Sequence, residues 1–479
     1  MVGKARDPVD SHAGVPRNEF RIVEPRPSPV KRVARAVHAR RILESDSGVH
    51  PNRPINSLIM AANTPQISII LATHNRASVL GETLATLRGL TDPVDHEILV
   101  VDNASDDDSA VVARRLADRV MARTDNLGSC AKGIALQDAA GEFILFLDDD
   151  STPRAGSLVR LLAYFRADPG LGAVGFRVDL PDGRQEGGAL PGVPIGCGVA
   201  FRRQALMSTG GIALDFFMQA EEYDWSFRLV SGGWKIRICS DLVVDHHKTK
   251  QARLPARTLY YDTRNNLRIV NRYLPEAARQ IYLDDWTQRY GWFASYNQSE
   301  CSPSAADSDT GSYAAAFQRG VDDAGSLAQR ERDEFSACRL APTQFEYFFR
   351  WNALAAWAEG MSREGVREVR MLGLGKNVYA FGRALLRAGI RVREIIDDRL
   401  GAPGRRYRDI PLALPNSLSG LRSFHDDVDA VVIGDMATVH AAATLRRHAS
   451  RLDGPVHIWA ESGDDYAMTC RVMETPVPV

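Results

Sequence analysis

Short, continuously apolar runs alternate with helically spaced segments in the first half of the chain. The apolar runs lie at 67–71, 97–101 and 143–147. Helical spacing after them predicts helices that end near 90 and 119, and a third helix over 131–140. Strands that are apolar throughout, and do not alternate with polar residues, are typical of a parallel sheet covered by helices on both faces. The pattern therefore predicts an α/β fold with a mostly parallel sheet between helices.

The composition and hydrophobic pattern of the sequence change at three boundaries along the chain. Residues 1–64 are rich in Pro, Arg and Ser, which predicts a flexible extension, and 65–275 hold the first α/β domain. Within that domain, two short strands are predicted at 235–239 and 242–245. Residues 276–364 are mostly helical in pattern, with a polar loop at 302–312. Residues 365–479 return to alternating strands and helices, which predicts a small Rossmann-like α/β domain.

Composition and charge exclude several classes of protein. The 479 residues carry 59 Lys+Arg and 60 Asp+Glu, and a net charge of −1 argues against nucleic-acid binding. No apolar run approaches the roughly 18–20 residues of a membrane span, and the N-terminus lacks a signal-peptide core. The 6 cysteines form no CxxC pair, so we expect a reduced, cytoplasmic protein. A basic stretch at 29–43 leaves open peripheral contact with the inner face of the membrane, although a disordered tail with a solvated basic helix is the favoured interpretation.

Polar clusters follow three of the predicted strands. They are 73–76 (THNR), 102–106 (DNASD) and 148–150 (DDD). Ligands of open α/β sheets gather at the carboxyl ends of the strands, so the three clusters are expected at one sheet edge. Three consecutive carboxylates repel one another and favour a counter-cation, and hard oxygen ligands suit Mg²⁺ or Mn²⁺. The simpler interpretation is a solvated acidic turn.

The order of the motifs resembles that of family 2 glycosyltransferases of the GT-A fold. The stretches that carry the resemblance are SIILATHNR, EILVVDNASDD, DNLGSCAKGIAL, GEFILFLDDD, GCGVAFRR, EEYDWSFR and VVDHH. They span about 66–275. The resemblance implies a GT-A domain that binds a nucleotide-diphosphate sugar together with a divalent cation, Mn²⁺ or Mg²⁺. The donor would be a UDP-, dTDP- or GDP-sugar.

The resemblance also assigns roles to individual residues. Asp150 and His246 would hold the metal, with His247 as the alternative to His246. Glu222 would be the base for the acceptor hydroxyl, with Asp224 as an alternative and Glu221 as a weaker one. The donor-binding residues would be Thr73, Asn75, Arg76, Asp102, Asn103, Ser105, Gly128, Lys132, Asp148 and Asp149. The acceptor-side residues would be Gly198, Trp225 and Arg228.

Three features of the EEYDWSFR segment leave alternatives open. The family more usually has Asp where Glu222 stands, and acidic residues at a helix start are also favoured by the helix dipole. Asp224 and Arg228 are spaced i,i+4 and could simply pair along a helix. Trp225 could stack on an acceptor sugar, but a place in the core explains it better.

The predicted reaction is metal-dependent, inverting transfer of a sugar to the hydroxyl of a saccharide, a lipid-linked acceptor or a small molecule. Assembly of the chain into a homo-oligomer is left open as a further expectation. Two other functions are weighed: a degenerate domain that binds a sugar nucleotide or saccharide without turnover, and a sugar nucleotidyltransferase. An oxidoreductase centred on Gly373 and Gly375 is a third, but Val378 occupies the position where a dinucleotide fingerprint needs a small residue.

Overall fold

The computed structural model describes residues 64–248, 255–300, 312–417 and 423–459. The basic stretch at 29–43 lies outside the described residues, as does the predicted loop at 302–312 apart from Ser312. Among the described residues, no helix combines the length and the hydropathy that a membrane crossing requires.

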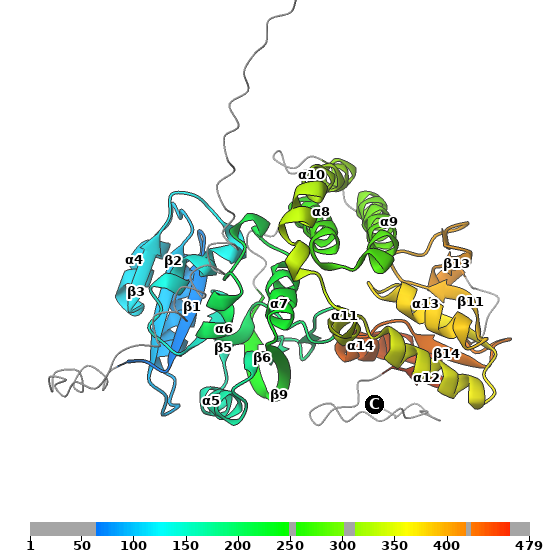
Figure 1. The fold of residues 1–479 in the computed structure, drawn as a ribbon, viewed down its shortest axis with the longest axis horizontal. Coiled ribbons are helices and arrows are strands. Elements are labelled where there is room, and N and C mark those ends of the chain that lie inside the picture. The colour runs from blue at the N-terminus through cyan, green and yellow to red at the C-terminus, as the bar shows by residue number, and fades with distance from the viewer. Residues whose placement is uncertain (1–63, 249–254, 301–311, 418–422, 460–479) are drawn as a thin grey trace, which may run out of the picture. The chain divides into compact units, whose positions relative to one another are not determined.

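The first domain is built on a sheet of nine strands, and the predicted α/β class is confirmed (Figure 1). The strand order is β3-β2-β1-β4-β8-β6-β9-β5, and β7 pairs with β6. Strands β1, β2, β3 and β4 run parallel, whereas β8 is antiparallel to both β4 and β6. The strands are β1 (Ile67–Thr73), β2 (His96–Asp102), β3 (Arg119–Ala122), β4 (Phe143–Leu147), β5 (Ser151–Pro153), β6 (Leu171–Asp179), β7 (Gln185–Glu186), β8 (Gly198–Arg202) and β9 (Lys235–His246).

The apolar strands are buried because helices cover both faces of this sheet. One core includes Leu71, Leu84 and Leu161, and the other includes Ile70, Ala135 and Trp225. The covering helices are α3 (Ala77–Arg88), α4 (Ser109–Leu116), α5 (Ser157–Ala167), α6 (Arg203–Ser208) and α7 (Glu221–Ser231).

Three predicted elements differ in the structure. The second helix ends at Leu116, because β3 already begins at Arg119. The third is a 3₁₀ helix over Gly128–Gln137. The two strands predicted at 235–239 and 242–245 are one strand, β9, whose pairing with β6 shifts in register after Cys239.

A helical region follows the first sheet, and it completes the core around α7. Its helices are α8 (Pro255–Tyr273), α9 (Glu276–Glu300), α10 (Tyr313–Glu334), α11 (Pro342–Phe349) and α12 (Trp351–Arg363). Helices α8, α9 and α10 pack against one another (Figure 1). The ring of Phe227 in α7 lies 4.4 Å from that of Phe348 in α11, so the first domain and this region share one aromatic core.

The C-terminal residues form a second, smaller sheet, as predicted. Its order is β12-β13-β11-β10-β14-β15, and all of its neighbours are parallel except β12 and β13. The elements are β10 (Glu368–Leu372), α13 (Val378–Arg387), β11 (Arg391–Ile396), β12 (Arg406–Tyr407), β13 (Ile410–Ala413), β14 (Ala430–Ile433), α14 (Thr438–His448) and β15 (Val456–Ile458).

Candidate active site

The three consecutive aspartates lie directly after β4, and the loop after β1 binds two of them. Thr73 donates a hydrogen bond of 2.7 Å to Asp149 Oδ2. The guanidinium group of Arg76 donates to Asp149 and, at 2.7 Å, to Asp150 Oδ2. Burial raises the pKa of Asp149 to about 6, although Arg76 and Thr73 act in the opposite direction. The loops after β1 and β4 therefore form one charged rim, as the parallel pairing predicts.

Asp102 ends β2 beside this rim, because it is the register partner of Thr73. Its side chain is buried, and Oδ1 has no hydrogen-bond partner among the described residues. A buried carboxylate oxygen without a partner is costly, so a donor from a bound molecule would stabilise it. Oδ1 of Asp102 is thus an acceptor to which the base or ribose of a nucleotide could donate a hydrogen bond.

The other predicted donor-site residues of this edge hold the loops in place. The side chain of Asn103 donates to the carbonyl of Gly128 at 2.8 Å and accepts from the amide of Leu127. Ser105 accepts a hydrogen bond from the amide of Asn75. These contacts favour a positioning role for Asn103 and Ser105.

Gly128 begins the 3₁₀ helix in a conformation that only glycine adopts at low cost. Its φ is +63°, and a Cβ at this position would lie 2.2 Å from the carbonyl oxygen of Phe217. Four residues later, the buried ammonium group of Lys132 donates to Asp148 Oδ1 at 2.6 Å and to the carbonyl of Gly196 at 3.2 Å. Lys132 therefore joins the acidic rim to the segment before β8.

His246, at the end of β9, lies at the same rim. Its Nε2 is 3.2 Å from Asp150 Oδ1, and its Nδ1 is 2.6 Å from Glu186 Oε2. His247 is exposed and only its backbone amide contacts Asp150, so the structure brings His246, and not His247, to the carboxylates. Burial alone would lower the pKa of His246, but hydrogen bonds with Asp150, Cys197 and Glu186 raise it.

The donor set at this corner fits a divalent cation. Ligand atoms of Asp148, Cys197 and His246 lie within 4.8 Å of one another, in the one such group found among the described residues. Asp150 adds a carboxylate beside His246. Carboxylate oxygens and an imidazole suit Mn²⁺ or Mg²⁺, whereas a thiol is a soft ligand that these ions do not prefer.

Sequence reasoning missed Glu186, although it is the closest partner of His246. It lies on the short strand β7, in a glycine-rich stretch without hydrophobic periodicity, so no pattern marks it. Burial alone would raise its pKa, but hydrogen bonds from His246 and Lys248 lower the pKa of Glu186 to about 2. Glu186 therefore stays ionised and orients the His246 ring.

Glu221 and Glu222 begin α7, and the charge of Lys132 acts on both. Glu222 Oε1 lies 3.2 Å from the position that a Cβ on Gly196 would take, and the carbonyl of Gly196 binds Lys132. Burial raises the pKa of Glu222, and the positive charge of Lys132 opposes that rise. Glu221 accepts a hydrogen bond from Ser129, and burial raises its pKa as well.

Asp224 is buried, and residues of its own helix and of α8 bind its carboxylate. Its carboxylate binds Arg228 at 2.6 Å, Arg272 at 2.9 Å and the hydroxyl of Tyr273 at 2.6 Å. The i,i+4 pairing with Arg228 is confirmed. Burial alone would raise the pKa of Asp224, and the two guanidinium groups lower it. This environment favours a structural role.

The three predicted acceptor-side residues are also buried. Trp225 packs edge-on against Phe201 in the core, with ring centroids 4.9 Å apart. Besides Asp224, Arg228 binds the carbonyls of Thr209 and Gly211. A Cβ on Gly198 would contact Phe176. None of the three presents an open surface to an acceptor.

We expect Asp224→Asn to lower the free energy of unfolding by about 3–5 kcal/mol, because it leaves Arg228 buried without its counter-charge and removes one of the carboxylates that bind Arg272. Urea unfolding would measure the loss. Asp322→Asn, an exposed change on α10, is the matched control. An Asp224→Asn protein of unchanged stability but lost activity would instead place Asp224 in the chemistry.

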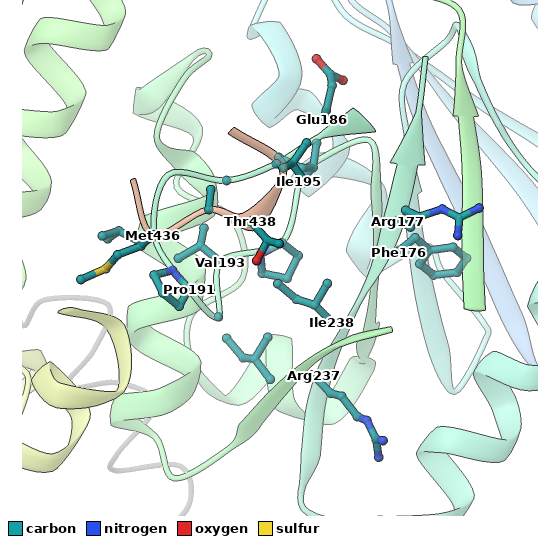
Figure 2. A pocket seen from close by; sticks show the side chains of 18 of the residues that line it. Phe176, Arg177, Glu186, Pro191, Val193, Ile195, Arg237, Ile238, Met436 and Thr438 are labelled. Atoms are coloured by element: carbon teal, nitrogen blue, oxygen red, sulfur yellow. The ribbon is translucent and has the colours of Figure 1, made fainter. Parts of the chain in front are cut away.

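A cavity of about 500 Å³ lies next to the rim but not at it (Figure 2). Its lining is largely apolar, and the C-terminal domain adds Met436 and Thr438. Glu186 stands at its edge with the carboxylate directed away from Val193 and Pro191 (Figure 2). The cavity therefore meets the acidic cluster only through Glu186, and the rim holds the groups capable of chemistry.

The fold and the order of the motifs define a glycosyltransferase domain of the GT-A type. Residues 68–207 match the family model described as Glycosyl transferase family 2, in agreement with the resemblance of the motifs. The match ends before α7.

Curated relatives are similar to part of the chain. The pre-mycofactocin glycosyltransferase of Mycobacterium tuberculosis (strain ATCC 25618 / H37Rv) is 25% identical over 248 residues, which are 46% of this chain and 50% of that protein. The GalNAc(5)-diNAcBac-PP-undecaprenol beta-1,3-glucosyltransferase of Campylobacter jejuni is 33% identical over 105 residues, 20% of this chain and 34% of that protein. The chain thus spans half or less of the length of these relatives.

Among solved structures, the chain is similar to the mannosyltransferase PcManGT from Pyrobaculum calidifontis in complex with GDP-Man and Mn²⁺. The identity is 18%, and the match covers 64% of this chain and 94% of that chain with a TM-score of 0.37.

Proposed function

We propose that this protein transfers a sugar from a nucleotide-diphosphate sugar to an acceptor hydroxyl, with inversion at the anomeric carbon. One observation carries the proposal: Asp102, the three aspartates 148–150 and His246 meet at one sheet edge, and Glu222 lies close to Gly196, whose carbonyl binds Lys132. This arrangement offers a nucleotide acceptor, a cation site and a separate carboxylate.

The donor would lie along the rim. Asp102 Oδ1 would accept from the base or ribose, since it is buried and has no partner among the described residues. Arg76 and Lys132 are cations beside the position of the diphosphate, where charge-assisted hydrogen bonds are strong. Asp150 and His246 would hold a divalent cation, with Asp148 near it. Such a cation offsets the negative charge that grows on the departing diphosphate.

Glu222 is the proposed base. It would take the proton of the acceptor hydroxyl as that oxygen attacks the anomeric carbon from the face opposite the diphosphate. Asp224 is unsuited because three donors already occupy its carboxylate. Glu221 is less suited because it accepts from Ser129. A raised pKa serves a base that must receive a proton near neutral pH.

A thermal-shift panel tests the proposal. UDP-, dTDP- and GDP-sugars are added with Mn²⁺ or with EDTA, and we expect at least one to raise the unfolding temperature only when Mn²⁺ is present. A panel without any shift would contradict the proposal. A shift without hydrolysis or transfer of the sugar would favour a degenerate binding domain.

A further inference from the structure

The loop between β10 and α13 (373–377) contacts helix α9 and the first domain. The indole of Trp286 in α9 donates to the carbonyl of Lys376 at 3.0 Å, and Arg289 donates to that of Leu374 at 3.0 Å. The side chain of Asn377 donates to the carbonyl of Ala189 at 3.1 Å. The described residues of both sheets belong to one compact unit, so these contacts join its parts.

In a dinucleotide-binding domain this loop would face a pyrophosphate. Here its carbonyls are held by α9. The acid after the next strand, Asp397, is also engaged, because its carboxylate accepts from the backbone amides of Leu374, Arg399 and Leu400. The loop therefore serves contact within the protein, and the oxidoreductase alternative loses its ribose ligand.

The side chain of Lys376 extends from this loop to the first turn of α7. Its Nζ lies 2.7 Å from Asn266 Oδ1, 3.4 Å from the hydroxyl of Tyr223 and 4.7 Å from the centroid of the Tyr223 ring. It also lies 5.4 Å from a ring centroid of Trp286. Tyr223 directly follows Glu222, so Lys376 binds the helix turn that carries the proposed base, and its charge acts on Glu222.

We infer that Lys376 is a positioning residue of the transfer site: its ammonium group fixes the first turn of α7 and stabilises the negative charge of the Glu222 carboxylate. The inference rests on the proposed function. It makes the C-terminal domain part of the acceptor side of the site, with no part in binding the donor.

The charges around both groups agree with this role. Glu222 faces the cations Lys132 and Lys376 and the acids Glu221 and Asp148. Lys376 faces Asp262 and Glu222, which attract it, and Arg289, which repels it. Burial lowers the pKa of Lys376 to about 8, so it is mostly charged at pH 7. Loss of this cation removes stabilisation from the Glu222 carboxylate, so the pKa of Glu222 rises.

The test measures hydrolysis of the nucleotide sugar, with water in place of the acceptor, from pH 5 to 9 in the full chain. The variants are Lys376→Met, Lys376→Gln, which keeps a hydrogen bond to Asn266, and Lys376→Arg, which keeps the charge. Lys235→Met, at an exposed lysine, is the control.

For Lys376→Met and Lys376→Gln we expect kcat at pH 7 to fall about tenfold and the acid limb of the profile to move up by at least about half a pH unit. We expect KM for the donor to stay within about twofold of the wild-type value. In Lys376→Arg we expect the acid limb of the pH profile to lie where it does in the wild type. A folded Lys376→Gln protein with the wild-type profile overturns the inference and leaves the proposed function intact. A wild-type protein that binds and hydrolyses no nucleotide sugar overturns both.

Discussion

Asp150→Ala is expected to abolish Mn²⁺-dependent binding of the nucleotide sugar and to reduce turnover about a thousandfold. Asp150 supplies a carboxylate oxygen 3.2 Å from His246 Nε2, and a bound dication contributes several kcal/mol to stabilising the leaving diphosphate. At about 1.4 kcal/mol for each factor of ten, such a loss corresponds to a thousandfold change. Isothermal titration with Mn²⁺ and the nucleotide sugar would measure binding.

Two further variants separate ligand loss from disruption of the rim. Asp150→Asn keeps the size of the side chain and an oxygen for Arg76, and we expect it to lose metal binding nearly as completely. Asp322→Asn on the exposed face of α10 serves as the surface control. Titration heats that are unchanged in Asp150→Ala would refute the metal assignment.

Glu222→Gln is expected to bind the donor as the wild type does, yet to lose about 10²–10⁴ of its kcat. The amide cannot take the proton of the acceptor hydroxyl, whereas the rim that binds the donor is untouched. Because burial raises the pKa of Glu222, we also expect the wild-type kcat to fall on acidification at a pH above the usual glutamate range. That limb should vanish in Glu222→Gln.

Glu221→Gln is the matched control, one residue earlier on the same helix. We expect a smaller loss, because Ser129 already binds Glu221. Full turnover in Glu222→Gln combined with a severe loss in Glu221→Gln would move the base to Glu221.

The sequence was most informative where structure is local. Apolar runs that end in polar residues predicted the strands, and parallel pairing then required the loops after β1, β2 and β4 to share an edge. The bonds from Thr73 and Arg76 to Asp149 confirm this for β1 and β4, and the register of Thr73 with Asp102 confirms it for β2. The 3₁₀ helix was missed because its residues have ordinary helical spacing, and the positive φ of Gly128 is a tertiary requirement.

The contacts that the sequence could not predict come from distant segments. Glu186, which binds His246, lies in a glycine-rich stretch of the sequence that has no hydrophobic periodicity. Arg272 reaches Asp224 from 48 positions away, and Lys376 reaches Tyr223 from 153. Pairings at such separations leave no repeat in the sequence. The roles of Glu222, Asp150 and His246 in catalysis stay predictions.

The buried ion pairs between α8 and α10 determine how far the gene can be shortened. Glu331 in α10 is buried against Arg272 at 2.6 Å and against Arg268, and Phe348 covers Phe227. A gene fragment stopped at codon 275 would remove Glu331, the buried carboxylate that Arg268 and Arg272 share, and would expose an aromatic surface. Recombinant work on an isolated catalytic half should therefore retain the chain at least through Phe349, well beyond the stretch that family comparison recognises.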